Sequence, residues 1–235
     1  MKRNLLFAAM MLVAGSLLAA DSTPKDDVTN AAKKLAEKDN YSWKSTVEIG
    51  GGVGAPFGGL TEGKTEKSGV ICLTMTRRDT SMEVFMKTGK GAFKGQDGWQ
   101  TFAEAAEAQQ GPGRFIGLMM QNFKAPAAQV ENLADKIKEL KKTDDVYAGD
   151  LTEEGAKALL SFRPGGGGGD APANAKGSIK IWLKDGIVSK FQIKLQGTIQ
   201  VNGEDRDIDR TTTVEIKDVG TTKISVPEEA AKKLP

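Results

Sequence analysis

The sequence of 235 residues contains no histidine and only one cysteine, Cys72. Without histidine, the chain cannot form a Ser-His-Asp or Cys-His arrangement, and it lacks the commonest zinc ligand and the usual general base at neutral pH. A single cysteine cannot form a disulfide within the chain, and its place in the apolar stretch "VICL" predicts a small buried strand residue. We therefore expect a protein that is not an enzyme and has neither a metal site nor a cofactor.

Long apolar runs are also scarce, and the one at the N-terminus has the features of an export signal. Leu5–Leu18 follows the basic residues Lys2 and Arg3 and leads into small residues ending at Ala20. This order is typical of a secretory signal peptide, and the run is too short and wrongly flanked for a membrane span. We expect residues 1–20 to be removed and residues 21–235 to form a single periplasmic or secreted domain. The alternative is an N-terminal amphipathic helix.

The chain carries little excess charge of either sign. It has 33 lysines and arginines against 31 aspartates and glutamates, and loss of the signal peptide removes two of the basic residues. Basic residues are scattered rather than clustered, so the sequence predicts no nucleic-acid partner and no basic strip for anionic membranes.

The first half of the mature chain predicts a helix followed by antiparallel strands. Apolar residues recur at helical spacing over residues 28–38, whereas "YSWKSTVEIG" alternates as a half-buried strand does. We expect further strands at Lys64–Thr76 and Thr80–Thr88, then a hairpin in "GAFKGQDGWQTF". The stretches "VICL" and "MEVFM" are apolar on both faces, so this sheet needs cover on both sides, or a cover and a cavity.

The second half predicts helices and then three long strands. Helical patterns occur in "FAEAAEAQQ", "GRFIGLMMQNF" and "PAAQVENLADKIKELKK", of which the second is apolar nearly all round. A strand in "DDVYAGDL" precedes a helix capped by Thr152. Three strands separated by Asp185-Gly186 and Asn202-Gly203 then lead to a short helix in "VPEEAAKKL". This order predicts an α+β fold with one antiparallel sheet around helices.

Two glycine-rich stretches, Gly50–Gly63 and Gly165–Gly169, have the composition of phosphate-binding loops but not their position. Such loops follow a strand and open a helix, so that backbone N–H groups converge on the anion. The first stretch lies between predicted strands, and the second follows a helix and precedes a strand. We expect a long hairpin loop able to fold over an apolar opening in the first, and a slack connection in the second.

Several segments together make the mature chain resemble the outer-membrane lipoprotein carrier superfamily, which includes LolA-like carriers and LppX/LprG-type lipoproteins. They are the helix leading into "YSWKSTVEI", the hairpin "KGAFKGQDGWQTF", the segment "VYAGDLTEEGAKALL" and the C-terminal "GSIKIWLKDGIVSKFQIKLQG" and "TTTVEIKDVGTTKISVPEEA". The resemblance implies a curved antiparallel sheet, an incomplete β-barrel wrapped around helices, with an apolar cavity for acyl chains. It implies no enzyme activity. The chain departs from the lipoprotein members because it lacks a cysteine for lipid attachment at the cleavage region.

The sequence thus predicts a non-enzymatic protein that binds acyl chains, a lipid or an acylated partner protein, with transient contact with the membrane or envelope proteins. Binding would be driven by apolar burial, at about 0.8 kcal/mol per methylene. The expected lining is Trp43, Val47, Ile71, Met82, Val84, Met86, Ile181, Phe191 and Ile193, with Phe115, Leu118 and Met119 as an inner lid. The alternative is a protein-interaction or sensor module of the same fold with a filled core and no ligand.

Overall fold

The computed structural model describes residues 22–50, 59–77, 80–95, 98–107, 112–161, 171–201 and 203–234. The expected signal peptide and Gly165–Gly169 lie outside the described residues, as does most of Gly50–Gly63. The side chains of Phe115 and Leu118 are also outside the described part, although the backbone of both lies in a helix.

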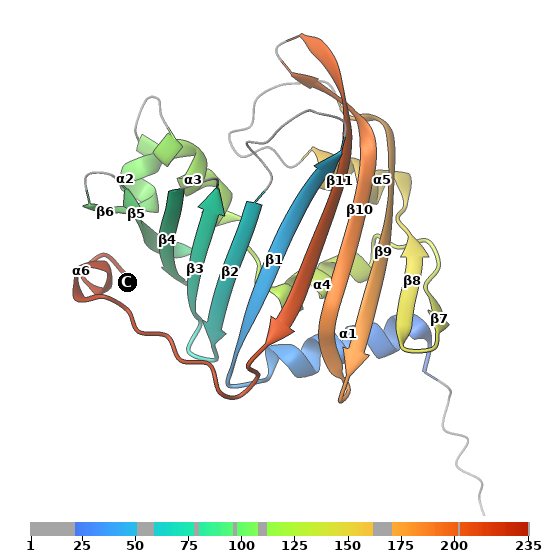
Figure 1. Ribbon diagram of the computed structural model, residues 1–235, viewed down its shortest axis with the longest axis horizontal. Coiled ribbons are helices and arrows are strands. Elements are labelled where there is room, and N and C mark those ends of the chain that lie inside the picture. Colours follow the sequence, from blue (N-terminus) through green and yellow to red (C-terminus); the bar gives the residue numbers. More distant parts are fainter. Residues whose placement is uncertain are drawn as a thin grey trace, which may run out of the picture.

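Eleven strands of the described chain form one antiparallel sheet in the order β6-β5-β4-β3-β2-β1-β11-β10-β9-β8-β7 (Figure 1). Their bounds are β1 Asn40–Gly50, β2 Gly59–Glu66, β3 Val70–Arg77, β4 Thr80–Lys87, β5 Lys90–Gly95, β6 Gly98–Thr101, β7 Lys141–Thr143, β8 Val146–Asp150, β9 Ala173–Lys184, β10 Ile187–Val201 and β11 Glu204–Lys217. Because β1 pairs with β11, the first strand and the last join the two halves of the chain in the middle of the sheet. The sheet is curved and does not close, which confirms the expected α+β architecture.

Helices cover one face of this sheet, behind the strands as drawn in Figure 1. Their bounds are α1 Pro24–Ala36, α2 Phe102–Glu107, α3 Pro112–Gln121, α4 Pro126–Ala134, α5 Glu153–Leu160 and α6 Glu228–Ala231. Helix α1 packs on α4 and on β9 and β10, and α5 packs on β9 and β10. Helix α3 packs chiefly on α2. The short α6 lies apart, near the C-terminus and below β5 and β6 in the figure, and Lys233 just beyond it is paired with Glu104 of α2 at 2.7 Å.

Helix α1 begins four residues earlier than its apolar spacing predicts. Thr23 accepts a hydrogen bond from the backbone N–H of Asp26, and the Asp26 carboxylate accepts one from the Thr23 N–H. This capping box and Pro24 at the first helical position start the helix before its apolar face begins. The buried face then consists of the predicted residues Val28, Ala31, Ala32 and Leu35.

The strand expected at Lys64–Thr76 is in fact two strands, β2 and β3. They are joined by a tight turn in which Gly69 has φ of +83° and donates its N–H to the Glu66 carbonyl at 2.9 Å. A positive φ favours glycine, and here it reverses the chain. The strand β2 also takes in Gly59–Gly63, which we expected to belong to a loop.

The helix expected over residues 126–142 ends at Ala134. Beyond it, Lys138 donates its N–H to the Asp150 carbonyl at 2.9 Å, and Thr152 donates its N–H to the Lys136 carbonyl at 2.7 Å. Ile137 forms a bridge with Leu151, and residues from Lys141 form the edge strand β7. The backbone groups that would continue the helix are thus paired with the end of β8.

The main core lies between the sheet and the helices, and β4 is covered on both faces. Val84 and Met86 belong to the cluster that includes the helical residues. Phe85, on the opposite face, is 2% exposed and lies 5.6 Å from the ring of Trp99. The apolar character of both faces is therefore accounted for at this strand.

Candidate functional site

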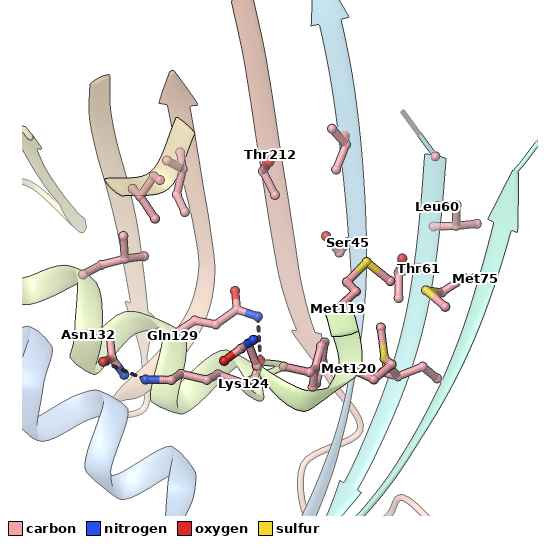
Figure 2. A pocket seen from close by; sticks show the side chains of 18 of the residues that line it. Ser45, Leu60, Thr61, Met75, Met119, Met120, Lys124, Gln129, Asn132 and Thr212 are labelled. Carbon is pink, nitrogen blue, oxygen red and sulfur yellow. Dashed lines mark hydrogen bonds between the residues drawn. The ribbon is translucent and has the colours of Figure 1, made fainter. Parts of the chain in front are cut away.

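A cavity of about 450 Å³ lies between the helices and the middle of the sheet (Figure 2). This volume is within the range of about 300–1,000 Å³ typical of small-molecule sites. Its strand residues are Ser45, Val47, Gly59, Leu60, Thr61, Leu73, Met75, Thr76, Ile193 and Thr212. Its other residues, from α3 to α5, are Met119, Met120, Asn122, Phe123, Lys124, Gln129, Asn132, Leu133, Lys136 and Leu159.

Strand register brings the sheet residues of the cavity together in two rows. In one row, Thr212 of β11 pairs with Val47 of β1 and with Ile193 of β10. In the other, Thr61 of β2 pairs with Ser45 of β1 and with Met75 of β3. Residues directly opposite each other on neighbouring strands share a face of the sheet, so these rows form the floor of the cavity.

Methionines and one phenylalanine form much of its apolar wall. Figure 2 shows Met75, Met119 and Met120 side by side, from β3 and α3. Phe123 follows α3 and stacks on the indole of Trp43, with ring centroids 6.3 Å apart and an interplanar angle of 19°. Methionine side chains adapt to irregular partners, so this wall suits a flexible apolar ligand.

The opposite edge of the cavity is polar and comes from α4 and the segments flanking it. Gln129 donates from Nε2 to the Lys124 carbonyl at 2.7 Å, and Lys124 donates from Nζ to Oδ1 of Asn132 at 2.9 Å (Figure 2). Our sequence reasoning missed this edge because it followed only the apolar face of the predicted helix. The signal was present in the polar residues at positions 129, 132 and 136, since this spacing places them on one helical face.

Three of the residues predicted to form the lining do so, namely Val47, Met119 and Ile193. Another five are buried in the main core: Trp43, Val84, Met86, Ile181 and Phe191. Ile71 and Met82 are partly buried and pack against this core. Trp43 is next to the cavity through its contact with Phe123. A role for any of these side chains in binding stays a prediction, as it does for Phe115 and Leu118.

One basic side chain of β11, Arg210, lies beside the cavity and belongs to none of the ion pairs within the described residues. Arg210 donates from its guanidinium to the carbonyl of Leu159, a cavity residue, at 3.2 Å. Its Nε is buried and has no hydrogen-bond partner among the described residues. Burial lowers the pKa of Arg210. The residues that line the cavity in the described part of the chain include no aspartate, glutamate or cysteine, and we find no cluster there that could hold a metal ion.

No family model matches the chain, and no curated protein matches it. Its fold is similar to several solved structures. LprF from Mycobacterium bovis has a TM-score of 0.47 and 11% identity, covering 88% of this chain and 97% of that one. LppX from Mycobacterium tuberculosis has a TM-score of 0.47 and 9% identity, covering 87% and 98%. A LolA superfamily protein from Nitrosomonas europaea has a TM-score of 0.37 and 10% identity, covering 87% and 96%. Within the described residues, no helix has both the length and the apolar character needed to cross a membrane.

Proposed function

We propose that this protein binds the acyl chain of a lipid, or of an acylated partner, in the cavity between the sheet and α3–α4, and that it catalyses no reaction. The observation that carries this proposal is the cavity itself, with methionine and phenylalanine on one side and amide and ammonium groups on the other. Such a lining suits an amphiphile, because each buried methylene contributes about 0.8 kcal/mol while the polar end stays near hydrogen-bonding groups. The N-terminal sequence supports export to the periplasm or beyond as the setting for this role.

The lining offers binding groups rather than catalytic ones. Its hydroxyls belong to Ser45, Thr61, Thr76 and Thr212, and its bases are Lys124 and Lys136. Nucleophilic catalysis needs a hydroxyl within hydrogen-bonding reach of a base. Both lysine ammonium groups instead donate to oxygens of Asn132. This arrangement supports a protein that holds its ligand without altering it.

A second candidate function is a protein-interaction or sensor module with no ligand. The observation that favours it is the filling of the core beside the cavity. Trp43 is 4% exposed, and Ile181 and Phe191 are fully buried, so the large apolar side chains in this part of the sheet pack against one another. If side-chain movement also closes the remaining cavity, only the surface is left for function.

Native mass spectrometry of the mature protein purified from its own envelope, followed by organic extraction, distinguishes the two functions. The binding proposal predicts an extractable lipid mass and uptake of a fluorescent fatty acid. Ile193→Trp should abolish uptake by filling the cavity floor, whereas Gln192→Trp, on the opposite face of the same strand, should leave uptake unchanged. A clean apo mass without probe uptake would favour the interaction module and contradict the binding proposal. Equal uptake by both variants would place any ligand elsewhere.

A further inference from the structure

Two lysines converge on one residue at the polar edge of the cavity. Lys124, between α3 and α4, donates from Nζ to the side-chain oxygen of Asn132 at 2.9 Å. Lys136, two residues beyond α4, donates from Nζ to the backbone carbonyl of the same Asn132 at 3.1 Å. Both ammonium groups therefore lie within one hydrogen bond of a single neutral residue (Figure 2 shows the first).

No described carboxylate is paired with either ammonium group. The ion pairs of 4.0 Å or less in the described chain do not include Lys124 or Lys136. Asp135 precedes Lys136, but its carboxylate is paired with Lys25 at 2.9 Å. The Lys25 hydrogen bond lowers the pKa of Asp135, and Lys136 adds to this effect only through its charge. The two ammonium groups donate to two different oxygens of Asn132, which is neutral, so an anion placed between them would be stabilised by both.

Apolar residues of the cavity are adjacent in the sequence to Lys124 and to Asn132. Phe123 immediately precedes Lys124, and Leu133 immediately follows Asn132. Both Phe123 and Leu133 line the cavity, and Leu133 is 4% exposed. Because Lys124 and Lys136 line the same cavity, an acyl chain in contact with Phe123 and Leu133 can place its polar end at the two lysines.

We infer that the cavity is selective for an anionic amphiphile, whose carboxylate or phosphate group is held by Lys124 and Lys136 while its acyl chain lies against Phe123 and Leu133. This inference rests on the proposed function and adds the chemical class of the ligand. A neutral amphiphile would fill the same apolar space without gaining an ionic interaction with either ammonium group. An anionic one makes charge-assisted hydrogen bonds, which are roughly twice as strong as neutral ones.

A matched pair of probes tests the inference: dansylaminoundecanoic acid and its methyl ester, which share one chain and differ in one charge. Delipidated wild-type protein at low salt should bind the acid about tenfold more tightly than the ester. Lys124→Gln/Lys136→Gln should reduce this preference to below about twofold by weakening acid binding, with ester binding unchanged. The control Lys90→Gln/Lys94→Gln removes two exposed charges from β5, away from the cavity, and should keep the wild-type preference.

Each other outcome has a defined meaning. If wild-type protein binds acid and ester equally, or if the double variant loses both equally, the charge selection is wrong and the proposed function stands. If wild-type protein binds neither probe, both are wrong. Inorganic phosphate alone should not raise the melting temperature. A rise in wild-type protein that the double variant loses would identify a site for free phosphate and refute the assignment of this site to the headgroup of a lipid. Should the glutamine variant fold poorly, Lys124→Arg/Lys136→Arg must retain the preference for the acid, and its loss would also refute the inference.

Discussion

Replacing Gly63 with alanine should destabilise the protein, because the indole of Trp43 lies where the new methyl group would be. Gly63 of β2 pairs directly with Trp43 of β1. A Cβ at Gly63 would lie 2.1 Å from Cε2 and from Cζ2 of Trp43. Carbon atoms in contact prefer a separation of about 3.5–4.0 Å, so the ring would have to move by more than about 1 Å.

The indole has little room for such a movement. Trp43 is 4% exposed, and its ring lies between Tyr41, at 5.8 Å between centroids, and Phe123, at 6.3 Å. Overpacking of this kind costs about 1–3 kcal/mol. Gly63 does not have a positive φ, so alanine would otherwise gain about 0.5–1 kcal/mol in a strand. Contact distances of 2.1 Å place the cost at the upper end of this range, so the net loss should be about 1–2 kcal/mol, which corresponds to a fall in melting temperature of roughly 2–8 °C for a domain of this size.

Thermal unfolding followed by circular dichroism measures this effect, and Gly95→Ala is its control. Among the described residues, a Cβ at Gly95 of β5 would have no neighbour closer than 3.6 Å, so this variant should be neutral or slightly stabilised. Trp43→Leu should destabilise on its own and cancel most of the additional cost of Gly63→Ala in the double variant. An unchanged melting temperature for Gly63→Ala, or full additivity in the double variant, would refute this account of the Trp43 contact.

Three further predictions concern ionisable groups. Arg210→Met should leave the melting temperature unchanged or raise it, because it removes a guanidinium group whose Nε is buried without a partner in the described chain. Arg206→Met, at an exposed 3.3 Å ion pair, is the neutral control, and a clear fall in melting temperature for Arg210→Met alone would contradict the prediction. The Lys233 hydrogen bond, followed by the one from the Thr101 N–H, lowers the pKa of Glu104 from 4.5 to about 2. The stability that this shift contributes is present above pH 4.5 and is lost as pH falls towards 2. Because the Lys233 hydrogen bond is the largest cause of the shift, Lys233→Met should move the pKa of Glu104 towards 4.5 in a carboxyl NMR titration, and no movement would exclude Lys233 as the cause. Cys72 is half-buried, not fully buried as the sequence predicts, and its partial burial raises the pKa of its thiol to about 11. A disulfide reagent at pH 8 should therefore react with Cys72 far faster in unfolded than in native protein, and equal rates would contradict this.

The fold was largely predictable because most helices and strands have the apolar spacing that is typical of their type. The alternation around Trp43 and the long strands before and after Asp185-Gly186 appear in the structure as expected. The errors lie where local hydrogen bonds override that spacing. The Ser68-Gly69 turn divides one continuous strand-like pattern into two strands, and the pairing of Lys138 with Asp150 ends a helix whose apolar spacing continues.

The candidate site was predictable only in part, for a reason that concerns side-chain size. We expected the lining at the largest apolar residues of the strands, but these are the residues that fill space, and Phe191 and Ile181 are fully buried in the core. The cavity is instead found above small strand residues such as Ser45, Thr61 and Thr212. A pattern of apolar residues in one strand does not reveal where small residues of neighbouring strands meet, because this depends on the register between them.

The way in which α3 and α4 are packed helps to explain why a cavity remains between them and the sheet. Helices α1 and α5 pack directly on β9 and β10, whereas α3 packs chiefly on α2, and α4 on α1. The two helices are thus held mainly by other helices, and the strand positions beneath them include the short side chains of Ser45, Thr61 and Thr212. A movement of α3 and α4 would repack methionines, which adopt many shapes at low cost, and would leave the β1–β11 pairing at the centre of the sheet intact. The same features that leave the core incomplete would therefore allow a ligand to enter without unfolding of the sheet.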